Sequence, residues 1–229
     1  MQRFKTLIFI LLIGCSSAEE EINPSIIGWQ FFPLETGDYR VYQVNAVRHF
    51  FNTTPDTVSY QLIEKTAGEF EDLSGGISYR IERSKRDNEN AEWEIDSVWT
   101  ARRDVYTATQ VEHNVPIIKL SFPLKENKKW NANSLNDKAI DEYFLKNVNV
   151  PFKINDTSIF QNTSTVIQDS VSDNILFRNL KKEIYSENIG LIYKEVTLLE
   201  FCAEVECVGQ DIIESGLEYK QWMIAYGKE

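Results

Sequence analysis

Most of the chain alternates apolar and polar residues with a period of two, which is typical of half-buried β-strands. Residues 77–83 alternate without a break, and residues 93–99 place Trp93, Ile95, Ser97 and Trp99 on one face. Comparable patterns predict strands at residues 39–50, 57–65, 105–112, 117–122, 143–154, 164–171, 191–201 and 219–226. The segment 174–187 fits either a helix or a strand. Glycine-containing turns are expected at residues 35–38 and 214–216.

Short polar turns separate these runs, so successive strands are expected to pair as neighbours. A sheet of this many strands tends to curl or close, because exposed edges invite aggregation. We therefore predict a mainly β fold: an antiparallel meander that forms a curved sheet, a half-barrel or a barrel, with few short helices. Because no repeat or interdomain linker is visible, residues 29–229 are expected to form a single β-rich domain.

The N-terminal residues form a secretion signal. Arg3 and Lys5 precede the apolar run 7–13 (LIFILLI), which is too short to span a bilayer. The next residues complete Leu12-Ile13-Gly14-Cys15, which resembles the lipobox of bacterial lipoproteins. The sequence thus predicts a signal peptide at residues 1–14 and lipidation of Cys15 with acyl chains, palmitate included. The alternative is an ordinary signal with a chance cysteine.

Residues 15–28 are expected to be a flexible acidic tether. They contain Glu19-Glu20-Glu21, which resembles a surface-export signal of Bacteroidetes lipoproteins but equally fits a solvated linker. No Asp follows Cys15, which by the known sorting rules favours the outer membrane. We expect lipid anchoring there, on the periplasmic face or the cell surface.

Charge excludes several kinds of partner. The chain carries 24 basic and 35 acidic residues, and its net charge is −11. Removal of residues 1–14 takes away two basic residues and makes the net charge −13. Nucleic acid requires a basic surface and is not expected as a partner. Anionic lipid would also be repelled, so the lipid anchor is expected to provide the attachment to the membrane.

Two cysteines remain after Cys15. Cys202 and Cys207 are separated by four residues and lie in an oxidising compartment if the chain is exported, so a structural disulfide is expected. We expect the pair to flank a four-residue hairpin loop. A metal site is disfavoured because no histidine is near, and a redox pair usually has two intervening residues.

No catalytic motif is present. His49 and His113 are far apart and occur in no zinc-binding pattern, and neither a nucleophile elbow, a P-loop nor a dinucleotide-binding motif occurs. Acidic residues are numerous, but no catalytic carboxylate pair can be chosen from the sequence. We expect no enzyme activity, no metal and no cofactor.

Three short motifs are candidate modification sites. Asp56-Thr57-Val58, Asp96-Ser97-Val98 and Asp169-Ser170-Val171 resemble the O-glycosylation motif of exported Bacteroidetes proteins. The hydroxyls concerned belong to Thr57, Ser97 and Ser170. Modification requires that each hydroxyl be exposed.

The chain also resembles a group of uncharacterised Bacteroidetes lipoproteins. Residues 31–42 match their opening form FPLxxGxYxxY, and residues 189–195 match a second block (GLxYKE). A third block comprises Cys202, Cys207, Gly209-Gln210, Gly216 and the ending Tyr226-Gly227. The resemblance implies a surface or periplasmic β-rich lipoprotein, and it transfers no catalytic residue.

Three functions remain open. The first is a non-catalytic envelope lipoprotein that binds a protein or glycan partner, which an exposed aromatic patch would favour. The second is a carrier or sensor of an apolar ligand inside the curved sheet, which requires an interior not filled by side chains. The third is a hydrolase with two converging carboxylates.

Overall fold

The computed structural model describes residues 24–168 and 172–229. The signal peptide, Cys15, most of the predicted tether and Ser170 lie outside these residues. The elements are α1 (Pro24–Ile27), the 3-10 helix η1 (Trp29–Phe31) and the strands β1 (Asp38–His49), β2 (Asp56–Glu71), β3 (Ile77–Arg86), β4 (Glu94–Arg103), β5 (Thr107–Glu112), β6 (Val115–Ser121), β7 (Lys129–Asn131), β8 (Glu142–Lys153), β9 (Ile159–Gln168), β10 (Ser172–Asp173), β11 (Phe177–Ser186), β12 (Gly190–Phe201) and β13 (Ile213–Lys228).

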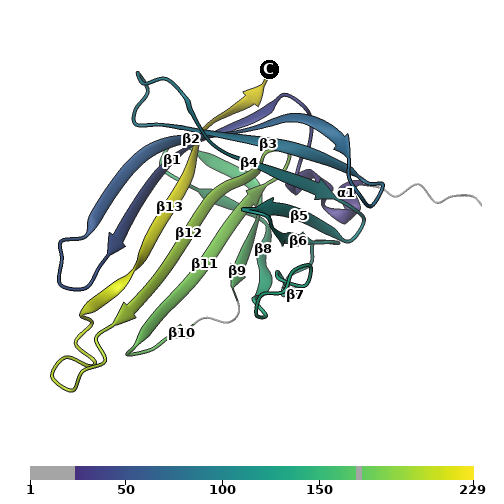
Figure 1. Cartoon of the computed structure of the whole chain (residues 1–229). Helices are drawn as coiled ribbons and strands as arrows, with labels where there is room; N and C mark the ends of the chain where they lie inside the picture. Colours follow the sequence, from purple (N-terminus) through teal and green to yellow (C-terminus); the bar gives the residue numbers. More distant parts are fainter. Residues whose placement is uncertain (1–23, 169–171) are drawn as a thin grey trace, which may run out of the picture.

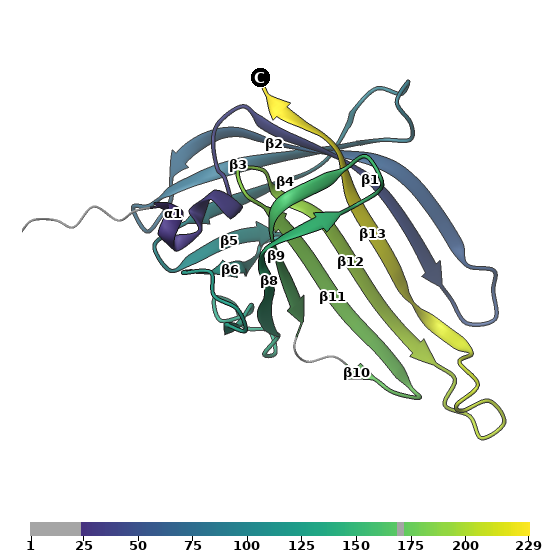
Figure 2. The ribbon, with the colours of Figure 1, turned by 180° about the vertical axis from the view of Figure 1, so that it is seen from behind.

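The strands form one antiparallel sheet in the order β6-β5-β4-β3-β2-β1-β13-β12-β11-β9-β8-β7, and β10 pairs with β11. The sheet curls until its two ends meet (Figures 1 and 2). The Ile118 amide of β6 donates to the carbonyl of Ala132, just after β7, at 3.0 Å, and the Trp130 indole donates to the Ile118 carbonyl. The predicted fold class, an antiparallel curved sheet with few short helices, is confirmed.

The N-terminal segment packs into the main core. Phe31 and Phe32 join a buried cluster with side chains from β3, β4, β6, β8, β9 and β11. Arg103 fixes the segment by donating to the carbonyls of Trp29 and Phe32, at 2.7 and 2.9 Å. The predicted tether is therefore too long at its C-terminal end. Residues 24–28 belong to the fold, because α1 and Gly28 pack beside the chain at Leu124.

A second buried cluster lies around β1, β12 and β13. It contains Tyr42, Val44, Leu62, Ile184, Ile192 and Met223. The end of the β8–β9 hairpin packs against it, with the Phe152 ring 5.5 Å from that of Tyr193. The Tyr42 hydroxyl donates to the Leu191 carbonyl at 3.0 Å, so even this fully buried tyrosine has a partner.

A β-bulge explains why one prediction was wrong about which side chains share a face of the sheet. Trp93, Ile95, Ser97 and Trp99 were expected on one face, yet Trp99 is buried and Ile95 is 83% exposed. The register shifts between the Arg83–Ser97 and Ser84–Ile95 pairs, so β4 carries one extra residue there. An extra residue reverses the face that the following side chains occupy.

The structure decides one alternative that the sequence left open and contradicts one prediction. The ambiguous segment 174–187 is mostly the strand β11. Gly216 was expected in a turn but lies within β13, where it pairs with Leu199 and where the backbones approach closely. Within the described residues, no helix has the length and apolar character needed to cross a membrane.

Candidate functional site

A buried ion-pair network crosses the inside of the curled sheet. Lys119 of β6 lies 2.6 Å from the Glu183 carboxylate of β11 and 3.2 Å from Glu112 of β5. Lys194 of β12 lies 3.4 Å from the same oxygen of Glu183, and the Tyr185 hydroxyl donates to its other oxygen at 2.6 Å. Because β6 and β11 lie far apart in the strand order, these contacts span the interior of the curl rather than one strand pair.

Lys119 reaches the interior because of a β-bulge. Simple alternation along β6 places Ile118 and Leu120 inside and Lys119 in solvent, yet the Lys119 side chain is only 8% exposed. The register between β5 and β6 shifts between the Thr109–Ile118 and Ala108–Leu120 pairs, so Lys119 is the extra residue. Bulges redirect side chains in this way. Sequence analysis missed Lys119 because alternation carries no sign of the bulge.

The opposite charges of Lys119 and of the carboxylates Glu183 and Glu112 favour the ionised form of all three groups. Burial favours the neutral form of Glu183, but the charges of Lys119 and Lys194 and the hydrogen bonds from Lys119 and Tyr185 outweigh it and lower its pKa to about 2. Burial likewise disfavours charge on Lys119, but Glu112 and Glu183 raise its pKa well above the usual value. The pKa of Glu112 is also lowered, since Lys119 and Lys194 overcome its burial. Both lowered pKa values favour the carboxylate form of Glu183 and Glu112.

The low pKa of Glu183 predicts that the stability of the fold decreases in acid. Its pKa is about 2 in the fold against an ordinary value of 4.5, so its contribution to stability is complete above pH 4.5 and is lost as the pH falls toward 2. We expect the free energy of unfolding of Glu183→Gln to lie below that of the wild type at pH 7, and the gap to shrink near about pH 3. Urea denaturation at both pH values measures this. Glu35→Gln, at an exposed ion pair, is the control with little effect. A gap that stays constant between the two pH values would contradict the assignment.

A second ionic group lines the other side of the interior. Arg83 donates to Glu64 at 3.0 Å and to Asp96 at 3.3 Å, and its guanidinium lies 3.6 Å from the centre of the Trp99 ring. Arg83 also donates to the Ser97 hydroxyl at 3.2 Å, and that hydroxyl donates to Asp96. The Ser97 hydroxyl is therefore occupied by hydrogen bonds, and the residue is half-buried rather than exposed. Both features disfavour its modification.

The ion-pair network borders a hollow of about 280 Å³. Side chains of β5, β6, β8, β11 and β12 and of the loop before β8 form its walls. They comprise Glu112, Val115, Ile117, Lys119, Asn133, Lys138, Asp141, Tyr143, Lys181, Glu183, Lys194, Glu195 and Val196. Because eight of these thirteen residues are charged, the hollow does not fit the apolar ligand of the second hypothesis.

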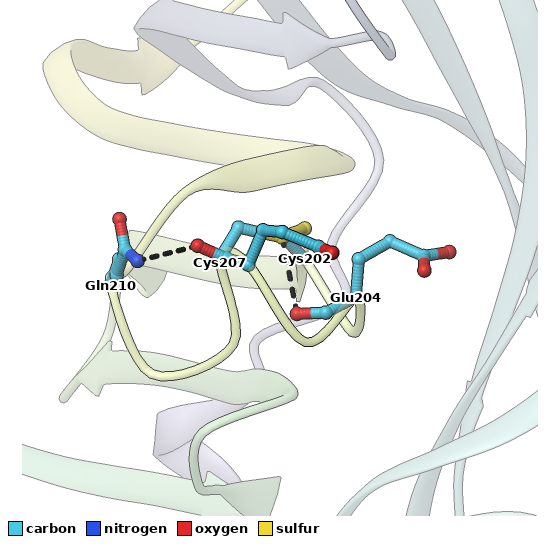
Figure 3. The surroundings of a disulfide bond; sticks show 5 residues. Cys202, Glu204, Cys207 and Gln210 are labelled. Atoms are coloured by element: carbon cyan, nitrogen blue, oxygen red, sulfur yellow. Dashed lines mark hydrogen bonds between the residues drawn. A yellow bond between two sulfur atoms is a disulfide. The ribbon is translucent and has the colours of Figure 1, made fainter.

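The cysteine pair lies at the far end of the sheet. The structure joins Cys202 to Cys207 by a disulfide with a Cα–Cα distance of 5.8 Å, within the usual range (Figure 3). The expected four-residue hairpin is wrong, because β12 ends at Phe201 and β13 begins at Ile213. The bond instead closes a compact turn inside residues 202–212. In this turn the Cys207 amide donates to the Glu204 carbonyl at 3.0 Å, and the Gln210 backbone amide donates to the Cys207 carbonyl at 3.1 Å.

Exposed apolar side chains gather at this end. His49 pairs with Gly216, Phe201 with Ile213 and Phe177 with Glu200, so the β1–β2 turn, the β12–β13 loop and the start of β11 are neighbours, as Figure 1 shows. We define the loop end as the exposed apolar residues of these segments: Phe50, Phe51, Ile175, Phe177, Val205, Val208 and Ile212. The same segments and the strand ends beside them contain the acidic residues Glu200, Glu204, Glu206, Asp211 and Glu218 and the basic residues Arg48 and Arg178.

Other predicted site residues do not converge. His49 pairs with Glu218 at 2.9 Å, while the His113 ring packs 5.8 Å from that of Trp99. Thr57 is exposed at the start of β2 and remains a candidate for glycosylation. Among the residues that the structure describes, no group of three or more histidine, cysteine, aspartate or glutamate side chains is arranged to hold a metal ion.

No family model matches the chain, and no curated protein does. Two solved structures resemble it. A candidate exported protein with a YmcC-like fold from Bacteroides fragilis has a TM-score of 0.43 and 11% identity over 86% of this chain and 99% of that one. A candidate lipoprotein from Parabacteroides distasonis has a TM-score of 0.42 and 11% identity over 86% and 98%. Similarity at this level transfers no site residue.

Proposed function

We propose that this chain is a lipid-anchored protein of the outer membrane, without catalytic activity, that binds a protein partner through the loop end. The observation that carries the proposal is the collection of seven exposed apolar side chains on three adjacent chain segments. Single exposed apolar residues are normal on a soluble surface, but a group with a polar rim is typical of protein interaction sites.

The chemistry of the partner follows from the rim. Five acidic and two basic residues lie in or beside the segments of the loop end, and the whole chain has a net charge of −11. Charges of opposite sign accelerate encounter and set the orientation of two proteins. The partner surface is therefore apolar at its centre and basic at its edge. A glycan, which is the alternative, would contact the faces of exposed rings rather than the aliphatic side chains that make up more than half of the loop end.

The position of the loop end fits an anchored protein. The chain reaches the fold through α1, and α1 lies on the opposite side of the molecule from the β12–β13 loop in both views (Figures 1 and 2). Attachment at Cys15 would leave the loop end directed away from the lipid surface. The disulfide keeps part of this surface in one conformation, which lowers the entropy cost of binding.

The test is chemical cross-linking of the membrane-attached protein in its own envelope, followed by identification of the products. We expect one protein to be recovered repeatedly with the wild type and to be lost with Phe51→Ser and Ile212→Ser together. Ile95→Ser changes an even more exposed apolar side chain on β4, so it is the control and should cross-link as the wild type. Repeated failure to recover any partner, or recovery that the loop-end variant does not reduce, would overturn the proposal.

A further inference from the structure

The hollow beside the ion-pair network is lined by four carboxylates and four lysines, and the free hydrogen-bonding capacity of these charged groups lies on the lysines. Its carboxylates already have partners. Glu183 accepts from Lys119 and Tyr185 and lies near Lys194. Asp141 accepts from Lys181, at 2.8 Å, and from Gln168. The remaining two, Glu112 and Glu195, are paired with Lys119 and with Lys182 and Lys220, respectively.

The lysines are less well satisfied than the carboxylates. Lys138 is exposed at the rim, and its ammonium has no ion pair in the described structure. Lys194 has only the 3.4 Å contact with an oxygen that Lys119 already occupies at 2.6 Å. Each ammonium can donate three hydrogen bonds, so Lys138 and Lys194 leave donors free beside the hollow.

We infer that the hollow binds a small organic carboxylate of about the size of a sugar acid. This ligand contains no positively charged group. Lys138 and Lys194 would bind the carboxylate group. The Asn133 amide nitrogen donates one hydrogen to the Ala139 carbonyl at 2.7 Å, and its second hydrogen would bind a hydroxyl. Val115, Ile117 and Val196 form the apolar part of the wall, which suits the carbon face of such a ligand.

The same contacts exclude other small ligands. An amino acid would bring an ammonium group into the hollow, where every carboxylate is already paired and where Lys138 and Lys194 would repel it. A neutral sugar would leave these lysines without an anion. An apolar ligand would bury charged groups without compensation. This inference is independent of the loop end, which lies outside the hollow.

The test is isothermal titration calorimetry of the purified mature protein in detergent, with D-glucuronate as the probe and with glucose and inorganic phosphate as comparison ligands. We expect saturable binding of glucuronate, no detectable binding of glucose and weaker binding of phosphate. Lys138→Gln should weaken glucuronate binding roughly tenfold, as expected for loss of one charge-assisted contact of about 1.4 kcal/mol. Lys138 has no partner in the fold, so this variant should keep its structure.

The control is Lys125→Gln, another exposed lysine without an ion pair that lies outside the hollow. It should bind glucuronate as the wild type does. The inference is overturned if glucuronate does not bind, if glucose binds equally well, if phosphate binds more tightly, or if Lys138→Gln and Lys125→Gln behave alike. Loop-end variants should leave glucuronate binding unchanged, so this result and that of the cross-linking experiment can be separated.

Discussion

Lys119→Met is expected to lower the free energy of unfolding by about 3–5 kcal/mol. The substitution removes the cation that pairs with Glu183 and Glu112, and the Glu183 side chain is only 10% exposed. Glu183 would keep only the Tyr185 hydrogen bond and the 3.4 Å contact with Lys194, so its desolvation cost would be much less well compensated. Urea denaturation at pH 7 measures the loss. Lys125→Met, on the exposed surface, should change stability by less than about 0.5 kcal/mol.

A double-mutant cycle separates the ion pair from simple packing. Lys119→Met combined with Glu183→Met removes both charges and leaves apolar side chains of similar length. Because replacement of a whole buried pair costs far less than removal of one partner, the double variant should lose less stability than the sum of the two single losses. The difference is expected to reach about 2 kcal/mol. Losses that simply add would mean that Lys119 and Glu183 do not interact.

Among substitutions in the sheet that add a single methyl group, Gly216→Ala should lower the free energy of unfolding most. Gly216 has φ +146, and a Cβ there would lie 2.2 Å from the Leu198 carbonyl oxygen and 2.9 Å from the Leu199 Cα. These atoms are backbone, so β12 and β13 would have to separate. We expect a loss of about 3 kcal/mol or more, because the strained backbone alone costs about 1–3 kcal/mol.

Gly68→Ala provides the matched control for that experiment. Gly68 also lies in a strand, but a Cβ there would meet no atom within 4 Å. Alanine at such a position reduces the entropy of the unfolded chain, so the variant should be as stable as the wild type or slightly more stable. Thermal unfolding of both variants measures the contrast. Equal losses at the two positions would show that the close approach at Gly216 is not the cause.

Strand positions were predictable from the sequence because alternation survives wherever one face of the sheet is buried. The strands at 77–86 and 115–121 lie close to their predicted limits. Which residues share a face was less predictable, because it depends on bulges at Asp96 and Lys119 that local sequence does not mark. The curled sheet was foreseen, but its charged interior was not, since it joins residues that are distant in sequence.

The same reasoning explains the turn errors. A glycine before a strand predicts a turn, yet Gly216 is needed for a close approach between β12 and β13. Residues 24–28 contain few signs of a helix, and they join the fold through contacts with Leu124, almost a hundred residues away. The loop end escaped notice for a related reason, because its apolar residues come from three separate segments that only strand pairing brings together.

An ionised carboxylate network inside the curled sheet is the central feature of this fold, and a pH titration of the Glu183 side-chain carboxyl carbon by NMR tests it most directly. With its pKa near 2, Glu183 should remain ionised at about pH 3.5, where an ordinary glutamate is mostly protonated. Exposed glutamates of the same protein provide the reference curve. A Glu183 midpoint at or above the ordinary value of 4.5 would mean that Lys119 does not hold this carboxylate, and the charged interior described here would be wrong.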